Sequence, residues 1–207
     1  CERRGAEFYP QAVVLHNDLA TQYATDPLFY FARLKQGNLL RSMNNFVGAQ
    51  IVYENLINGF PAHEMRYIAE LSRADCMLAL AGNDSDGLAD AVIILERLLD
   101  LPNLPLDFQA EAAQKWAFAL IKSGSSEKAK EVLWLSVDRF IGDGEKAAAL
   151  GAAGRYWLAR SMLQLGEIFE KQDNLVEARK VYRQVIAYNL PGRHIAISRV
   201  DQILQIE

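Results

Sequence analysis

The stretch MLQLGEIF at residues 162–169 decides the fold of this chain, together with Ala178, Tyr182 and Pro191 downstream. Its apolar residues recur at helical spacing, and the polar residues 171–174 interrupt the pattern before it resumes. Gly166 and Ala178 are small where two antiparallel helices would approach each other, and Tyr182 lies on the same helical face as Ala178. Proline at 191 cannot continue a helix. The stretch therefore predicts a pair of helices joined by a short turn, over about residues 147–190.

An alanine followed four residues later by a bulkier residue recurs along the chain. The five pairs are Ala12/His16, Ala49/Tyr53, Ala91/Leu95, Ala129/Leu133 and Ala178/Tyr182, with successive alanines 37 to 49 residues apart. A unit repeated at such intervals cannot bury its apolar face alone and stacks on its neighbours. The sequence predicts an all-α fold, a superhelix of about four helix pairs with partial units at both ends. We expect it to form one domain over residues 1–207.

Four segments depart from this plan. Residues 7–25 predict a lone second helix that ends at Asp26-Pro27, and residues 193–206 predict a last amphipathic helix that caps the array. Residues 82–87 predict a long loop inside the weakest pair. Residues 145–172 have no firm stop signal, so one long or kinked helix is favoured over a short helix followed by a longer one. Gly151 and Gly154 would each cost such a helix about 1 kcal/mol.

Composition and charge restrict the class of function. The chain is 51% apolar and 23% charged, with a net charge of −4 in which both signs are interspersed. No block of lysine and arginine is present that would neutralise phosphates, so nucleic acid is not an expected partner. No apolar run reaches the length of about eighteen residues that a membrane-spanning helix needs.

The residues that usually carry chemistry do not converge. His16, His63 and His194 are far apart and lack metal-ligand spacing, so we expect no metal, no cofactor and no catalytic site. Cys76 lies in an apolar stretch and is predicted to be a buried thiol. Cys1 has two interpretations, the trimmed end of a longer protein or the lipidated first residue of a bacterial lipoprotein, and the first is favoured.

The copies around Ala129 and Ala178 resemble the tetratricopeptide repeat family, whose strict period is 34 residues. The longer periods here, and the residues Tyr156-Trp157-Leu158-Ala159, are similar to the tetratricopeptide proteins of bacterial cell envelopes. The resemblance implies a right-handed superhelix whose concave side binds peptides or protein segments. It also implies a bacterial cytoplasmic or envelope location, with the envelope favoured.

The family's binding residues lie on the first helix of each pair and face the groove. Carried over by position, they are Phe31, Leu34, Asn38, Arg41, Gln114, Phe118, Lys122, Arg160, Leu163, Glu167 and Lys171. Family members that clamp a terminal carboxylate place lysines at two positions that Leu34 and Glu111 occupy here, so we expect no such clamp.

The predicted function is that of a non-catalytic scaffolding module that binds a segment of a partner protein in the groove. Two alternatives stay open. The chain could self-associate, with the helix at 7–25 stacking on the helix at 193–206 of a neighbour. It could also be an accessory region of a larger enzyme or of an envelope-assembly lipoprotein.

Overall fold

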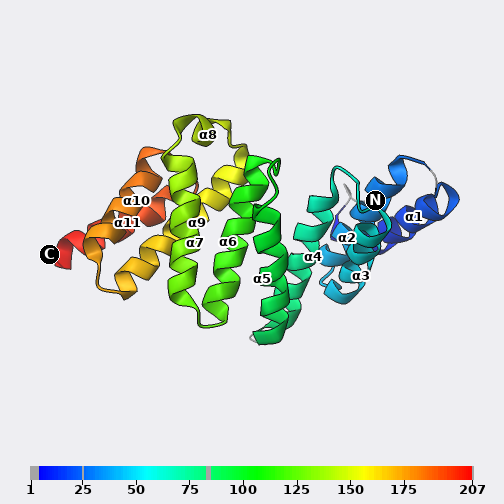
Figure 1. Ribbon diagram of the computed structural model, residues 1–207, viewed down its shortest axis with the longest axis horizontal. Helices are drawn as coiled ribbons and strands as arrows, with labels where there is room; N and C mark the ends of the chain where they lie inside the picture. Colours follow the sequence, from blue (N-terminus) through cyan, green and yellow to red (C-terminus); the bar gives the residue numbers. More distant parts are fainter. Residues whose placement is uncertain (1–4, 25, 83–84, 207) are drawn as a thin grey trace. The chain divides into compact units, whose positions relative to one another are not determined.

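The computed structural model describes residues 5–24, 26–82 and 85–206, and within these ranges every regular element is a helix (Figure 1). Cys1, and with it the question of lipidation, lies outside the described residues. The elements are η2 (Ala6–Phe8), α1 (Tyr9–Gln22), α2 (Leu28–Ser42), α3 (Phe46–Gly59), α4 (Arg66–Ala81), α5 (Ser85–Leu99), α6 (Leu106–Lys122), α7 (Ser126–Ile141), α8 (Gly144–Ala149), α9 (Ala152–Lys171), α10 (Leu175–Ala187) and α11 (Arg193–Ile206).

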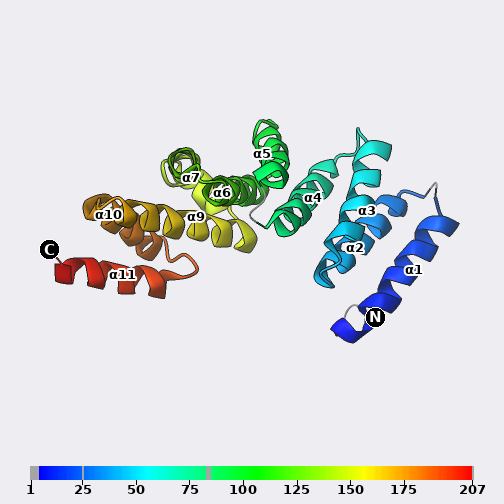
Figure 2. The same ribbon diagram turned by 90° about the horizontal axis from the view of Figure 1, so that it is seen from below.

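The chain divides into two compact units, Cys1–Ile94 and Leu95–Glu207, and α5 crosses the boundary. In the first unit α1 packs on α2, α2 on α3 and α3 on α4, as Figure 2 shows. In the second unit α9 contacts α6, α7 and α10, and α11 covers α10. Neighbours in sequence are thus neighbours in space, and the predicted all-α helical-repeat fold is confirmed. That the two units form one domain stays a prediction.

Three helix pairs are joined by the same turn. Asn44, Gly124 and Asp173 each adopt a positive φ, of 60°, 82° and 57°. The amide after each of them donates to the carbonyl five residues earlier, for example Asn174 N–H to Phe169 O at 2.9 Å. This is the hydrogen-bond pattern of a left-handed helix ending, which satisfies the last carbonyls of the first helix.

The residue after each positive φ is the N-cap of the second helix. The Asn45 and Asn174 side chains accept from Gly48 N–H at 3.0 Å and Glu177 N–H at 3.3 Å, which satisfies amides at the helix starts. Ser125 occupies the predicted N-cap position of α7, but its side chain makes no capping hydrogen bond.

The small residues are buried where the helices of a pair meet. Ala49, Ala91, Ala129 and Ala178 are 0% exposed, and the bulkier residues that follow them are at most 1% exposed. The first pair, Ala12/His16, is looser, with His16 half-buried. Gly37 of α2 and Gly166 of α9 lie against the rings of Tyr53 and Tyr182, so that an added Cβ would come within 2.5 Å of a ring carbon. The predicted packing marker is therefore confirmed in both units.

The favoured prediction of one long or kinked helix over residues 145–172 is wrong, and the alternative of a short helix followed by a longer one is confirmed. A short helix, α8, ends at Ala149 and α9 begins at Ala152. Leu150 and Gly151 between them are extended. Asp107 of α6 contacts this break, where its Oδ1 accepts the N–H of Gly151, the N-cap of α9, at 2.8 Å.

The other segment expectations have mixed outcomes. Helices over residues 9–22 and 193–206 agree with the two predicted end helices, and Cys76 is buried as predicted. The loop predicted to reach Gly87 ends earlier, because α5 begins at Ser85.

No helix in the described ranges combines the length and apolarity needed to cross a bilayer.

Candidate functional site

The second unit carries a hollow of about 360 Å³ beside α9. Its lining comes from α6, α9, the turn before α11 and α11 itself, namely Gln114, Tyr156, Ala159, Arg160, Leu163, Gln164, Glu167, Pro191, Gly192 and Ile195. A second hollow of about 190 Å³ shares Gln164 and Glu167 and continues to Lys171 and Gln172. We call the two together the α9 trough.

Helical spacing on α9 builds the floor of the trough. Tyr156, Arg160, Leu163 and Glu167 are separated by four, three and four residues, which places them on one face. The opposite face is buried, with Leu158, Met162 and Leu165 at most 1% exposed. Because that face is fixed in the core, the trough side chains project from a rigid helix and not from a loop.

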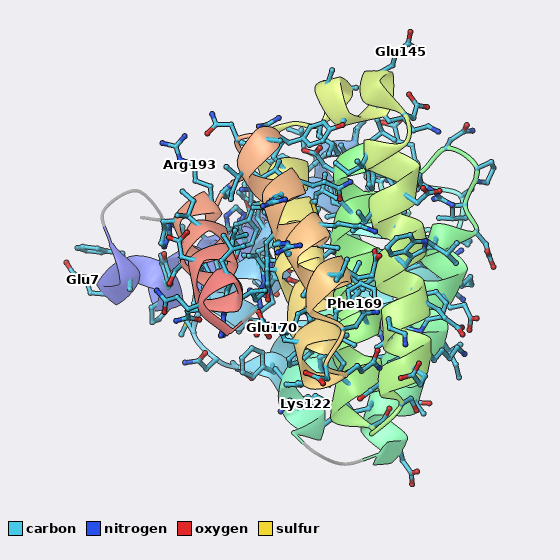
Figure 3. All side chains as sticks on the ribbon, turned by 90° about the vertical axis from the view of Figure 1, so that its left-hand side faces the viewer. Glu7, Lys122, Glu145, Phe169, Glu170 and Arg193 are labelled. Atoms are coloured by element: carbon cyan, nitrogen blue, oxygen red, sulfur yellow. The ribbon has the colours of Figure 1, made fainter. Side chains whose placement is uncertain are left out.

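Neighbouring side chains of α9 point to different sides. In Figure 3 Phe169 lies on the side of α7 and Glu170 on the side of α11. The Phe169 ring meets Trp134 of α7 edge-on, with centroids 6.3 Å apart, and Glu170 Oε2 lies 3.6 Å from Arg199 Nη1 of α11. These contacts fix the rotation of α9 about its axis and so the direction in which the trough residues face.

A buried hydrogen bond joins α6 to α9 inside the trough. Gln114 is only 4% exposed, and its Nε2 donates to Gln164 Oε1 at 3.2 Å. Next to it, Lys115 forms an ion pair with Glu111 and lies 5.1 Å from the centroid of the Trp157 ring. Gln114 and Lys115 thus both have polar partners within the protein.

The guanidinium of Arg160 is held at one end of the trough by two aromatic rings. It lies 5.9 Å from the Tyr156 centroid and 5.7 Å from the Trp157 centroid, and its Nη1 donates to the Tyr156 hydroxyl at 3.2 Å. Contacts of this kind limit the motion of a long side chain. Arg160 remains exposed, so its other N–H donors face solvent.

The charged residues of the trough are not neutralised within the protein. Lys130, Lys146, Lys180 and Arg199 in the same unit each lie within 4.0 Å of a carboxylate. Across the described part of the unit, neither Arg160, Glu167 nor Lys171 forms an ion pair. The trough therefore presents a guanidinium, a carboxylate and an ammonium whose charges are available to another molecule.

The predicted binding residues of the second unit fall into two groups. Gln114, Arg160, Leu163 and Glu167 line the larger hollow and Lys171 the smaller one. Phe118 and Lys122 line neither; the Lys122 ammonium instead lies 5.6 Å from the Phe118 ring centroid.

In the first unit, all four predicted residues take part in internal contacts. Leu34 is in the apolar core, 8% exposed, and this corrects its assignment to the groove. Asn38 accepts a hydrogen bond from the Tyr53 hydroxyl at 2.7 Å, and Arg41 forms an ion pair with Asp75. Phe31 is 40% exposed and meets the His63 ring edge-on at 6.2 Å.

Sequence reasoning missed the residues that α11 and its preceding turn bring to the trough. Pro191 was assigned only as a helix breaker, and Ile195 only as part of a capping helix. Tyr156 was assigned to α9 without a binding role. The feature that marks Ile195 as a surface residue is its exposed fraction of 43%. The helical pattern of the sequence alone does not reveal this value.

Two further properties restrict the chemistry of the site. The described residues contain no group of three or more His, Cys, Asp or Glu side chains placed to hold a metal ion. Tyr182, beneath the trough, has its pKa raised by burial and then by the Glu170 carboxylate, so its hydroxyl stays protonated at neutral pH.

The comparisons with known proteins identify the repeat. The family model described as a tetratricopeptide repeat matches residues 160–189, which cover the second part of α9, its turn and α10. No curated protein matches the sequence. The finer resemblance to cell-envelope proteins has no support from these comparisons. With helix pairs stacked in each unit and the matched repeat forming one side of the trough, this chain carries a tetratricopeptide repeat over residues 160–189.

Proposed function

We propose that the α9 trough binds a segment of a partner protein and that the chain works as a scaffolding module. The family match supports a protein-interaction role, and the tetratricopeptide family is generally non-catalytic. The observation that carries the proposal is the trough itself, in which apolar and unneutralised charged side chains line one concave surface. Its volume of about 360 Å³ is within the usual range for binding sites, about 300–1,000 Å³.

The trough has the composition of a recognition surface. Tyr156 and Ile195 are each 43% exposed there, while Leu163 lies half-buried between them and the charged residues. Tyrosine and arginine are enriched among residues that dominate binding energy, because they offer large contact area together with directed hydrogen bonds. Pre-positioning of Arg160 by its aromatic neighbours lowers the entropy lost on binding.

Peptide selection followed by titration tests this proposal. Peptides enriched from a random displayed library on the 207-residue chain would be labelled, and their Kd measured by fluorescence anisotropy. The Leu163→Asp variant should weaken binding about tenfold or more, because it places a charge in the apolar floor. Val176→Asp is the matched control, since Val176 is 50% exposed on α10 and outside the trough. Equal Kd values for the two variants would remove the trough as the binding surface.

Self-association is a second candidate, which one observation on the first unit favours. Val14, Leu15 and Leu19 of α1 and Tyr23 just after it are each about half exposed, and Leu19 and Tyr23 line a hollow of about 320 Å³ with Phe29 of α2. Sedimentation of the chain over a hundredfold concentration range tests this candidate. A mass that rises with concentration and returns to that of a monomer in Leu19→Ser would support it, and a constant monomer would exclude it.

A further inference from the structure

Charge alternates along the α9 trough. Arg160 lies at the end near Tyr156, and Glu167 lies where the two hollows meet. Leu163 and Ile195 line the larger hollow with them and provide its apolar surface. Over the larger hollow, charge complementarity therefore calls for a partner with an acidic group opposite Arg160, an apolar side chain in the middle and a basic group opposite Glu167. Lys171 lies beyond this stretch, in the smaller hollow.

We propose that the α9 trough recognises an extended peptide segment in which a carboxylate and a cationic side chain flank an apolar residue. This inference rests on the proposed function and specifies the partner's chemistry. The carboxylate binds the free N–H donors of Arg160, the apolar side chain contacts Leu163 and Ile195, and the cation pairs with Glu167.

The separation of the two charges sets the spacing in the partner. Arg160 and Glu167 are seven residues apart on one helix, which at 1.5 Å per residue corresponds to about 10 Å along its axis. An extended segment rises about 3.3 Å per residue, so its acidic and basic residues would stand about three positions apart. A helical partner would need about seven positions to span the same distance.

The polar groups of the larger hollow favour the extended form. An extended segment leaves its backbone N–H and C=O groups unpaired, whereas a helix pairs most of them within itself. Gln114 and Gln164 in the same lining bond to each other, but each amide keeps further donors and acceptors for a peptide backbone.

Selection from the peptide library on the 207-residue chain tests whether the enriched peptides share the proposed motif. We expect the enriched peptides to carry Asp or Glu three residues from Lys or Arg, with an apolar residue between them. Enrichment of a seven-residue spacing would overturn the extended form. Enrichment of peptides without any acid–base spacing would overturn the whole inference.

Substitutions of the charged trough residues test which of them recognise the motif in the peptide. Arg160→Gln and Glu167→Gln should each raise the Kd of the enriched peptides about fivefold or more, whereas Arg183→Gln, on the exposed face of α10, should leave it unchanged. The Arg160→Glu variant should regain affinity for a peptide whose acidic residue is replaced by lysine. Circular dichroism of each variant checks that the helices remain folded.

The outcomes separate this inference from the proposed function. Peptides that lose affinity with Leu163→Asp but not with Arg160→Gln or Glu167→Gln would overturn the charge motif and leave the trough as the binding surface. Peptides unaffected by Leu163→Asp, or a selection with no enrichment, would overturn both.

Discussion

The ring of Tyr182 on α10 lies against Gly166 on α9 so closely that a Cβ built on Gly166 would come within 2.5 Å of its Cζ atom. Gly37 and Tyr53 have the same relation in the first unit, where the added Cβ would lie 2.5 Å from Cε1. In both pairs the tyrosine follows the glycine by sixteen residues. The glycine and the tyrosine therefore stand at corresponding positions of the repeat. Their contact sets how closely the two helices approach.

Gly166→Ala should lower the free energy of unfolding by about 1–3 kcal/mol, because the added methyl group overpacks the contact with Tyr182. This loss would exceed the gain of about 1 kcal/mol that alanine brings to a helix interior. Gly59→Ala is the matched control, since a Cβ there meets nothing within 4 Å. Urea unfolding followed by circular dichroism measures both. Equal stabilities for the two variants would contradict the close contact.

An ion pair recurs beside each tyrosine with its charges reversed. Arg41 of α2 pairs with Asp75 of α4, and Glu170 of α9 pairs with Arg199 of α11. Arg41 and Glu170 each lie four residues after the glycine of their repeat. Both pairs thus join the first helix of one repeat to the first helix of the next.

Reversing the second pair should therefore preserve stability. Glu170→Arg alone is expected to destabilise the chain by about 1 kcal/mol, and adding Arg199→Asp should recover most of that loss. The same double swap at the exposed Lys180–Glu177 pair is the control, with an expected coupling of at most about 0.5 kcal/mol. A double-mutant cycle from thermal unfolding measures both. No coupling between 170 and 199 would mean that the pair does not link the repeats.

Asp107→Ala should lower the free energy of unfolding by about 1 kcal/mol, because it removes the acceptor of the Gly151 amide at the start of α9. Hydrogen exchange should show faster exchange of the Gly151 amide than in the unaltered chain. Asp201→Ala, an exposed aspartate on α11, serves as the control and should change neither measurement. An unaltered Gly151 exchange rate would show that Asp107 does not protect this amide.

Stability should fall as the pH rises above 10. Burial, and then the Glu70 carboxylate, raise the pKa of Tyr30 to about 12. Burial also raises the pKa of Tyr53 and Tyr182. The folded state thus holds these protons more tightly than the unfolded chain, so the stabilisation is complete below pH 10 and is lost as pH rises towards 12.

Urea midpoints at pH 8, 9.5 and 11 test this sign, and Tyr30→Phe provides the comparison. The variant loses the hydrogen bond from the Tyr30 hydroxyl to Met65 O and should be less stable at every pH. Its midpoint should nevertheless fall less steeply above pH 10. An identical slope for both proteins would mean that Tyr30 does not contribute to the alkaline loss.

The helix pairs could be predicted from sequence because their markers are local. Ala178, Tyr182 and Gly166 report on one hairpin, and their spacing is visible along the chain. The break before α9 could not be predicted, because the residue that contacts it, Asp107, is 44 residues away on α6.

The predicted binding residues likewise divide into those that a local sequence pattern predicts and those that it does not. The face of α9 that carries Arg160, Leu163 and Glu167 follows from helical spacing and the family's positions. Ile195 and Pro191 join the trough only through the packing of the next helix and turn, which no local pattern encodes. Leu34 was misplaced because a position carried over from the family does not report how deeply this chain buries it.

Photo-crosslinking from within the trough shows whether a bound peptide lies there. A benzophenone amino acid at position 156 or at position 188 would be irradiated with a selected peptide, and the products identified by mass spectrometry. Tyr156 lines the trough and Tyr188 lies outside it, with similar exposures of 43% and 37%. We expect a peptide adduct at 156 and none at 188. Adducts at 188 alone, or equally at both positions, would contradict binding in the α9 trough.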